Sequence, residues 1–247
     1  MRFLKNILES ICANILPTSC IACSAFQELM LCKSCEKTIQ VGGLLNYECC
    51  KQCGITLSKL EILHQRCHSC QKQSPYFDAT YCLDRYDGLL QDCLHQFKYH
   101  KRLAYGNGLA YTWNLFMGKH LEHIDAHFLL PVPLSKEKLC TRGFNQSWEI
   151  AKRIDCGNHI EKLPRALLRH HHHQHQALAS KVMRYQTIQE MFYLEHRYAP
   201  VFKDRTIIVF DDVMTSGATL NEIARILKDN GASRVINWVL LRTQQPQ

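Results

Sequence analysis

The sequence predicts an α/β protein with a mainly parallel, doubly wound sheet, preceded by a small cysteine-rich zinc-ribbon module. Two observations support this prediction. Four C-x-x-C pairs lie before residue 71. From about Pro75 onward, short apolar runs alternate with helical patterns, which is the order that βα units produce in a parallel sheet. We therefore expect the module at residues 1–74 and the α/β domain at residues 75–247.

The cysteine pairs have the spacing of zinc knuckles, because two intervening residues let both thiolates reach one tetrahedral ion. Disulfides would require an oxidising compartment, and residues 2–16 lack the long apolar run of a signal peptide. Eight ligands indicate two structural sites filled in sequence order, although an interleaved arrangement would use the same ligands. His64 and His68 are then surface residues. The expected zinc ligands are Cys20, Cys23, Cys32, Cys35, Cys50, Cys53, Cys67 and Cys70.

Length and charge narrow the classes of function. A chain of 247 residues is long enough for a full α/β domain, whereas the first seventy or so residues have few large apolar clusters and need metal to fold. The formal net charge of +8 suits nucleic acid and polyanionic small molecules equally, and the basic residues are dispersed. No run approaches the about 20 apolar residues of a membrane span. We expect a cytoplasmic protein without a membrane span.

The first half of the α/β domain begins with a strand at residues 81–86 and a turn at Asp87-Gly88. A helix at residues 89–97 follows, because its apolar residues recur at helical spacing. A second helix is expected at residues 108–121. The buried strand at residues 128–132 ends where prolines interrupt the pattern.

The second half repeats the alternation. After a loop, a helix is expected at residues 146–154. The apolar run at 206–210 predicts the central strand, and residues 218–228 predict its helix, with Gly231 as the C-cap. Residues 234–241 form the closing strand. Isolated cysteines in this domain, such as Cys140, are expected to be small buried side chains.

The most informative stretch is the end of the central strand. Four apolar residues run into Asp211 and Asp212, and a loop of small and hydroxyl residues leads into a helix. Ligands bind at the carboxyl ends of parallel strands, and a helix N-terminus favours phosphate. Ionised carboxylates accept hydrogen bonds from ribose hydroxyls. A helix cap alone would explain one such residue but not the whole set. The expected phosphoribosyl-binding residues are Asp211, Asp212, Thr215, Ser216, Gly217, Ala218 and Thr219.

Residues 207–219 resemble the ribose-5-phosphate signature of the type I phosphoribosyltransferases at all thirteen positions. Further segments resemble the ComF/GntX family, which joins such a domain to an N-terminal zinc ribbon. Those segments are Tyr86-Asp87-Gly88, Phe97-Lys98-Tyr99, Leu130-Pro131-Val132-Pro133-Leu134, Arg142-Gly143-Phe144-Asn145-Gln146 and Leu240-Leu241-Arg242-Thr243. The chain departs from the family near Gln176, where Ala179 and Thr187 replace a leucine and an asparagine. The histidines at 170–173 and 175 are interpreted as incidental.

The resemblance implies a type I phosphoribosyltransferase-like fold and a site for 5-phosphoribosyl-1-pyrophosphate (PRPP), with Mg²⁺ on the pyrophosphate and Asp211 and Asp212 as catalytic residues. Lys98 and Arg142 are candidates for binding the pyrophosphate, although each could instead be an ordinary surface residue. Three functions stay open. They are a phosphoribosyltransferase with an unknown acceptor, a catalytically silent PRPP-binding regulator, and a zinc-ribbon adaptor that binds single-stranded DNA and partners of the competence machinery during DNA uptake.

We predict that reduced, freshly purified protein contains about two zinc ions per chain. Nothing in the sequence connects the metal sites to the ligand site. Substitution of Cys53 or Cys70 is therefore expected to remove one ion and leave ligand binding largely intact. Metal analysis by plasma emission checks the stoichiometry, and protein free of zinc would contradict the prediction.

Overall fold

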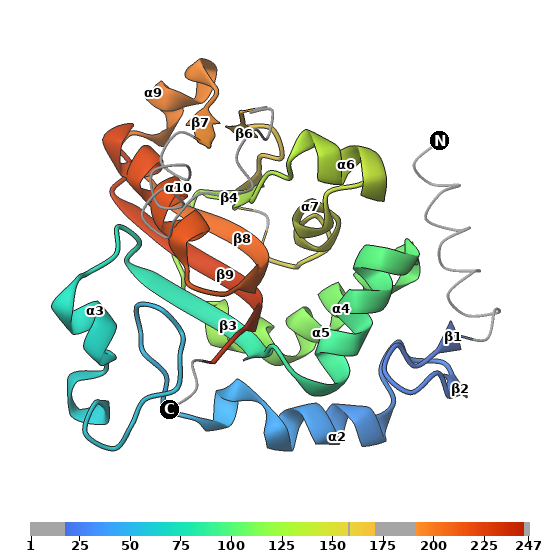
Figure 1. The fold of residues 1–247 in the computed structure, drawn as a ribbon. Coiled ribbons are helices and arrows are strands. Elements are labelled where there is room, and N and C mark those ends of the chain that lie inside the picture. The colour runs from blue at the N-terminus through green and yellow to red at the C-terminus, as the bar shows by residue number, and fades with distance from the viewer. Residues whose placement is uncertain (1–17, 158, 171–190, 245–247) are drawn as a thin grey trace, which may run out of the picture.

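The computed structural model describes residues 18–157, 159–170 and 191–244 (Figure 1). Its centre is a five-stranded sheet in the order β3-β9-β8-β4-β5, and every neighbouring pair is parallel. The expected mainly parallel sheet is thus confirmed. The strands are β3 (Ala79–Arg85), β4 (Phe128–Pro131), β5 (Glu161–Lys162), β8 (Thr206–Met214) and β9 (Arg234–Arg242).

Alternate residues of the central strands divide the interior into two cores. Ile208 and Phe210 of β8 face the core that contains residues of α4, α5 and α7. Ile207 and Val209 face the core that contains residues of α10. Successive side chains of a strand point to opposite faces, so a strand with helices on both sides must be apolar along its whole length. The helices are α4 (Gly88–His100), α5 (Leu103–Leu121), α6 (Lys136–Arg142), α7 (Gln146–Ala151), α9 (Ala199–Phe202) and α10 (Ala218–Asp229).

The N-terminal module lies against the α/β domain along the β3 edge of the sheet, where the blue and cyan ribbon runs in Figure 1. Its first half shares a core with α5, and Ile21 lies so close to Gly108 that a Cβ there would come within 2.3 Å of Ile21 Cγ2. Its second half belongs to the core on the opposite face. The elements are β1 (Thr18–Ser19), β2 (Phe26–Gln27), α2 (Lys33–Gly42), η1 (Leu44–Asn46), η2 (Ile62–His64) and α3 (His68–Lys72).

The element order agrees with the prediction, whereas several boundaries and elements differ. β8 continues to Met214 instead of ending at Phe210, because its pairing with β9 extends to Met214↔Arg242. Helix α6 follows β4 in a segment for which the sequence predicted no helix, and its N-cap Ser135 accepts a hydrogen bond from the Lys138 amide. Cys140, on this helix, is exposed rather than buried.

An antiparallel pair of short strands, β6 (Leu167–Arg169) and β7 (Phe192–Leu194), was also not predicted. Each strand has three residues, too few to show a period-two pattern, and β7 packs on α10. The 3-10 helix η3 (His196–Tyr198) connects β7 to α9. The departures at Gln176, Ala179 and Thr187, and the histidines from residue 171 onward, lie outside the described residues. Among the described helices, none is long and apolar enough to cross a membrane.

Candidate functional site

Two groups of four cysteines form in sequence order, and the thiols of each group lie within 4.8 Å of one another. The interleaved arrangement is therefore excluded by the geometry. His64 and His68 are exposed and belong to neither group. We call the groups the first cluster, made of Cys20, Cys23, Cys32 and Cys35, and the second cluster, made of Cys50, Cys53, Cys67 and Cys70.

The local backbone explains why each pair converges. In each knuckle an amide turns back onto the carbonyl of the first cysteine, as in Gly54 N to Cys50 O at 2.8 Å. Gly54 has φ +72°, a left-handed conformation that favours glycine. Four thiols at this separation fit a tetrahedral Zn²⁺ site. Hydrogen bonds from Cys53 and Cys70 lower the pKa of Cys50, which prepares the anionic form that binds metal.

The 215–219 loop connects β8 to α10 through a left-handed glycine. Gly217 has φ +81° and is the N-cap residue of α10. The backbone amide of the next residue, Ala218, donates to Ser216 Oγ at 3.3 Å. Thr215 and Ser216 are exposed, whereas Gly217 is buried. The turn therefore points exposed hydroxyl residues and the positive end of a twelve-residue helix outward at the carboxyl end of β8. This arrangement suits a phosphate.

The two acids lie inside β8 rather than after it. Asp211 and Asp212 are 9% and 4% exposed, and α7 supplies partners to both. Ser147 Oγ donates to Asp211 Oδ1 at 3.2 Å, and Gln146 Nε2 donates to Asp212 Oδ1 at 3.3 Å. The sequence interpretation missed Ser147 and any role for Gln146, although the N-cap pattern at the start of α7 was available as a signal.

Asn145 aims the N-terminus of α7 at the acids. Its side-chain oxygen caps the helix by accepting from the amides of Ser147 and Trp148, and its Nδ2 donates to Val132 O at 3.0 Å. One side chain thus fixes the helix start against the end of β4. This explains physically why α7 presents its first two residues to β8.

Lys98 and Arg142 both join the network around the acids. Lys98 on α4 forms a buried ion pair with Asp212. Arg142 Nη1 donates to Gln146 Oε1 at 2.5 Å, and its guanidinium lies 5.7 Å from the centre of the Tyr99 ring. The structure therefore brings both predicted pyrophosphate residues to Asp212, one directly and the other through Gln146.

The two acids have opposite pKa shifts. Burial raises the pKa of Asp211 well above its usual range, and repulsion from Asp212 adds to the effect. Burial also acts on Asp212, but attraction to Lys98 outweighs it and lowers the pKa of Asp212. Two close carboxylates beside one cation share the available charge. The ligand-free site therefore favours the charged form of Asp212 and the neutral form of Asp211.

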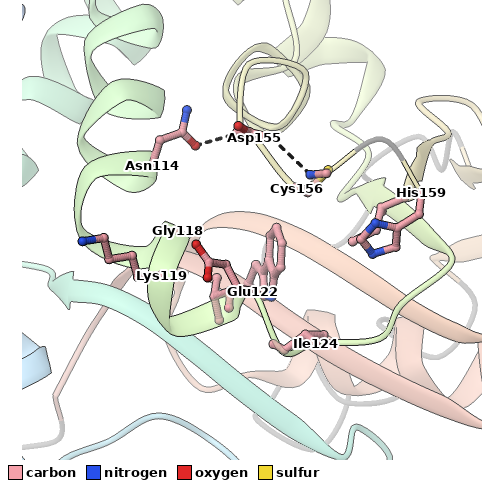
Figure 2. A pocket seen from close by; sticks show the side chains of 12 residues that line it. Asn114, Gly118, Lys119, Glu122, Ile124, Asp155, Cys156 and His159 are labelled. Atoms are coloured by element: carbon pink, nitrogen blue, oxygen red, sulfur yellow. Dashed lines mark hydrogen bonds between the residues drawn. The ribbon is translucent and has the colours of Figure 1, made fainter.

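A cavity of about 400 Å³ lies elsewhere, between the end of α5 and the segment that leads into β5 (Figure 2). Asn114 and Lys119 line it from α5, and Asp155 and His159 line it from the opposite side. Asn114 Oδ1 accepts from the Asp155 amide at 2.9 Å. This cavity lies beside the starts of β4 and β5, whereas the 215–219 loop follows the carboxyl end of β8. The two are therefore at opposite ends of the parallel strands.

Comparison with known proteins supports the fold. Residues 141–247 match the model of the phosphoribosyl transferase domain. Competence protein F of Haemophilus influenzae is 28% identical over 215 residues, which cover 86% of this chain and 90% of that protein. The DNA utilization protein YhgH of Escherichia coli K12 is 28% identical over 217 residues, with the same two coverages. Competence protein ComFC of Bacillus subtilis 168 is 26% identical over 221 residues, covering 86% of this chain and 84% of that protein.

Among solved structures, an allosteric regulatory enzyme of purine biosynthesis aligns with 60% of this chain and 30% of its own, at 15% identity and a TM-score of 0.38. The parallel sheet and the matched domain define a protein with a phosphoribosyltransferase-like domain, joined to a cysteine-rich module with two metal-binding clusters. With relatives named competence protein F and ComFC, the resemblance to the ComF/GntX family is confirmed.

We predict that Lys98→Met destabilises the ligand-free protein by about 3–5 kcal/mol, because it leaves the buried Asp212 without its cation. Lys152→Met is the control. Lys152 pairs with Glu149 at 2.7 Å, but its side chain is 34% exposed, so its loss should cost about 1 kcal/mol or less. Urea unfolding at neutral pH measures both. Equal losses in the free energy of unfolding would show that the buried Lys98–Asp212 pair stabilises the protein no more than the exposed pair does.

We also predict a pH dependence that Asp211→Asn removes. A carboxyl whose folded pKa is raised stabilises the protein at low pH, and this stability is lost as pH rises from about 4, the usual pKa of Asp in an unfolded chain, through the raised folded value. Asp212 acts oppositely, since its stabilisation is lost as pH falls through its lowered pKa. As pH rises from about 4 to about 8, the melting temperature of the wild type should therefore fall relative to that of Asp211→Asn. Parallel curves would contradict the shift at Asp211.

Proposed function

We propose that the chain binds PRPP, or another ribose carrying a 5-phosphate, at the carboxyl end of β8. The observation that carries this proposal is the sequence of features along one turn. Two buried acids are followed by exposed hydroxyl residues, a left-handed glycine and a helix N-terminus. The hydroxyl residues, the glycine and the helix N-terminus suit a phosphate. The two acids supply acceptors for the hydroxyls of a ribose. No other described turn combines all of these groups.

The residues divide the ligand between them. The start of α10 and the hydroxyls of Thr215, Ser216 and Thr219 receive the 5-phosphate. Asp211 and Asp212 accept from the ribose hydroxyls. Lys98 and Arg142 are the cations available for the pyrophosphate, because Lys98 contacts Asp212 directly and Arg142 reaches it through Gln146. Carboxylates suit Mg²⁺ as ligands, and Mg²⁺ bound with PRPP would neutralise charge on the leaving pyrophosphate.

As an enzyme, the chain would be a phosphoribosyltransferase whose acceptor is unidentified. Its residues would act by positioning the ribose and stabilising charge. Binding requires Asp212 to exchange Lys98 for a ribose hydroxyl, which would release the lysine toward the pyrophosphate. A catalytically silent PRPP-binding regulator would use the same contacts. Release of pyrophosphate in the presence of candidate acceptors distinguishes these two functions.

The names of the relatives support a link to DNA uptake, and we propose that the protein acts there in the cytoplasm, where eight zinc-binding thiols stay reduced. Single-stranded DNA and proteins of the competence machinery are then candidate partners. Binding of single-stranded DNA through phosphate contacts would weaken steeply as salt rises. Titration at two salt concentrations tests this part of the proposal separately from PRPP binding.

We predict that Asp211→Asn and Asp212→Asn weaken PRPP binding by about 1.5–3 kcal/mol per lost charge-assisted bond. Gly217→Val should weaken it more, because valine is strained at φ +81° and its Cβ would lie 2.5 Å from Met214 Cε. Calorimetry with PRPP and Mg²⁺ gives the affinities.

Asp229→Asn is the matched control for these variants, since Asp229 ends the same helix and is more than half exposed. Its affinity should equal that of the wild type. If the acids only cap the helix, their substitution would lower stability by about 1 kcal/mol and leave the affinity unchanged. Unchanged PRPP affinity in both Asp variants, with normal melting temperatures, would refute the phosphoribosyl site.

A further inference from the structure

Arg242 occupies an unusual position at the end of β9. It is 3% exposed, and within the described parts of the chain it forms no ion pair with a carboxylate. Its hydrogen bonds go instead to oxygens of two other segments and of the adjacent Thr243. Nε donates to Cys53 O at 2.9 Å, and Nη1 donates to Met214 O at 3.1 Å and to Thr215 O. One buried guanidinium thus joins a ligand of the second cluster to the beginning of the 215–219 loop.

The cluster side of this contact is firmly attached to the sheet. Thr80 of β3 donates its amide to Lys51 O at 3.0 Å and its hydroxyl to Gln52 O at 2.6 Å. Gly54 fits so closely that a Cβ there would lie 2.6 Å from Cys82 Sγ. The knuckle from Cys50 to Gly54 is therefore held against β3. The Cys53 carbonyl within it gives Arg242 a fixed acceptor.

The loop side has a second connection to the same module. The Tyr76 amide, just after the second cluster, donates to Asn221 Oδ1 in the first turn of α10 at 2.7 Å. Phe77 Cζ lies 3.9 Å from the position of a Cβ on Gly217. The segment that leaves the cluster therefore touches the helix N-terminus that follows the loop, while Arg242 holds the residues that precede it.

Charge explains why a guanidinium can be buried here. A buried cation without a partner is costly, and carbonyl dipoles compensate part of that cost. Four thiolates exceed the charge of one Zn²⁺, so a filled second cluster is anionic and attracts Arg242. The planar fork of arginine can also serve several acceptors at once, which a lysine ammonium cannot do in the same geometry.

We propose that Arg242 is a positioning residue that holds the 215–219 loop on the second cluster, so that metal in this cluster sets the affinity for the 5-phosphate of ribose. The inference rests on the proposed phosphoribosyl site and adds its regulation. It also replaces the sequence-based expectation that loss of Cys53 or Cys70 leaves ligand binding intact. The first cluster has no such contact with the loop among the described residues, so the two metal sites have different roles.

The test uses the full chain with four variants. Arg242→Lys removes the fork, and Cys70→Ser removes a ligand of the second cluster while keeping the Cys53 carbonyl. Arg234→Lys is the control on the same strand, since Arg234 is exposed at the start of β9. Cys35→Ser is the control in the first cluster. Calorimetry with ribose 5-phosphate gives the affinity, and metal analysis gives zinc per chain.

Arg242→Lys should weaken ribose 5-phosphate binding about tenfold or more, the scale of one charge-assisted hydrogen bond network, while it keeps two zinc ions. Cys70→Ser should show a similar loss with one ion. Both controls should bind within about twofold of the wild type. Unchanged affinity in Arg242→Lys, or equal losses in Cys70→Ser and Cys35→Ser, would overturn the proposal.

Hydrogen exchange in the ligand-free protein keeps the two proposals distinguishable. The Thr243 amide donates to Met214 O at 3.1 Å, so its exchange reports whether the strand end and the loop stay together. It should accelerate in Arg242→Lys, in Cys70→Ser and in wild-type protein stripped of zinc by a chelator. Wild type that does not bind ribose 5-phosphate would refute the phosphoribosyl site alone. Unaltered Thr243 exchange in Cys70→Ser and in the zinc-stripped wild type would refute the proposal that metal in the second cluster holds the 215–219 loop, even if Arg242→Lys fails to fold.

Discussion

The parallel pairing of β8 and β9 is the constraint on which the rest of the structure depends. Nearly every residue of the two strands is buried, and the pairing continues to Met214↔Arg242 at the carboxyl end. Because the strands are parallel, the functional groups of both emerge at the same edge of the sheet. The acids of β8, the loop to α10 and the guanidinium of β9 are therefore assembled by backbone hydrogen bonds, before any side chain contributes.

Charge at this edge is balanced locally rather than exposed to solvent. Lys98 pairs with Asp212 and lowers its pKa, whereas burial and repulsion from Asp212 raise the pKa of Asp211. Removing one partner from such a buried network is costly, because it leaves the other charge uncompensated. The ligand-free site is thus already polarised, with the donors of α7 holding the acids in place.

The cysteine-rich module is part of the fold and not an appendage. Its two clusters lie in the two different cores that the sheet separates, so each face of the α/β domain is completed by one of them. A segment of this size buries too little apolar surface to fold alone, and metal binding supplies folding free energy. Packing against the sheet gives the same segment a way to influence the site, through Arg242 in the case of the second cluster.

The sequence by itself determined the fold class, the order of the strands and main helices of the parallel-sheet domain, the eight cysteines of the two clusters and the strand–loop–helix junction from Asp211 to Thr219. These features have local signatures, namely fixed cysteine spacing, strand and helix periodicity and a strand–loop–helix junction. Only the tertiary structure decided that Asp212 pairs with Lys98, that Gln146 and Ser147 reach the acids, and that Arg242 joins Cys53 to Thr215. Those contacts join residues between 27 and 189 positions apart. Their partners are chosen by strand register and helix packing, which no local pattern records.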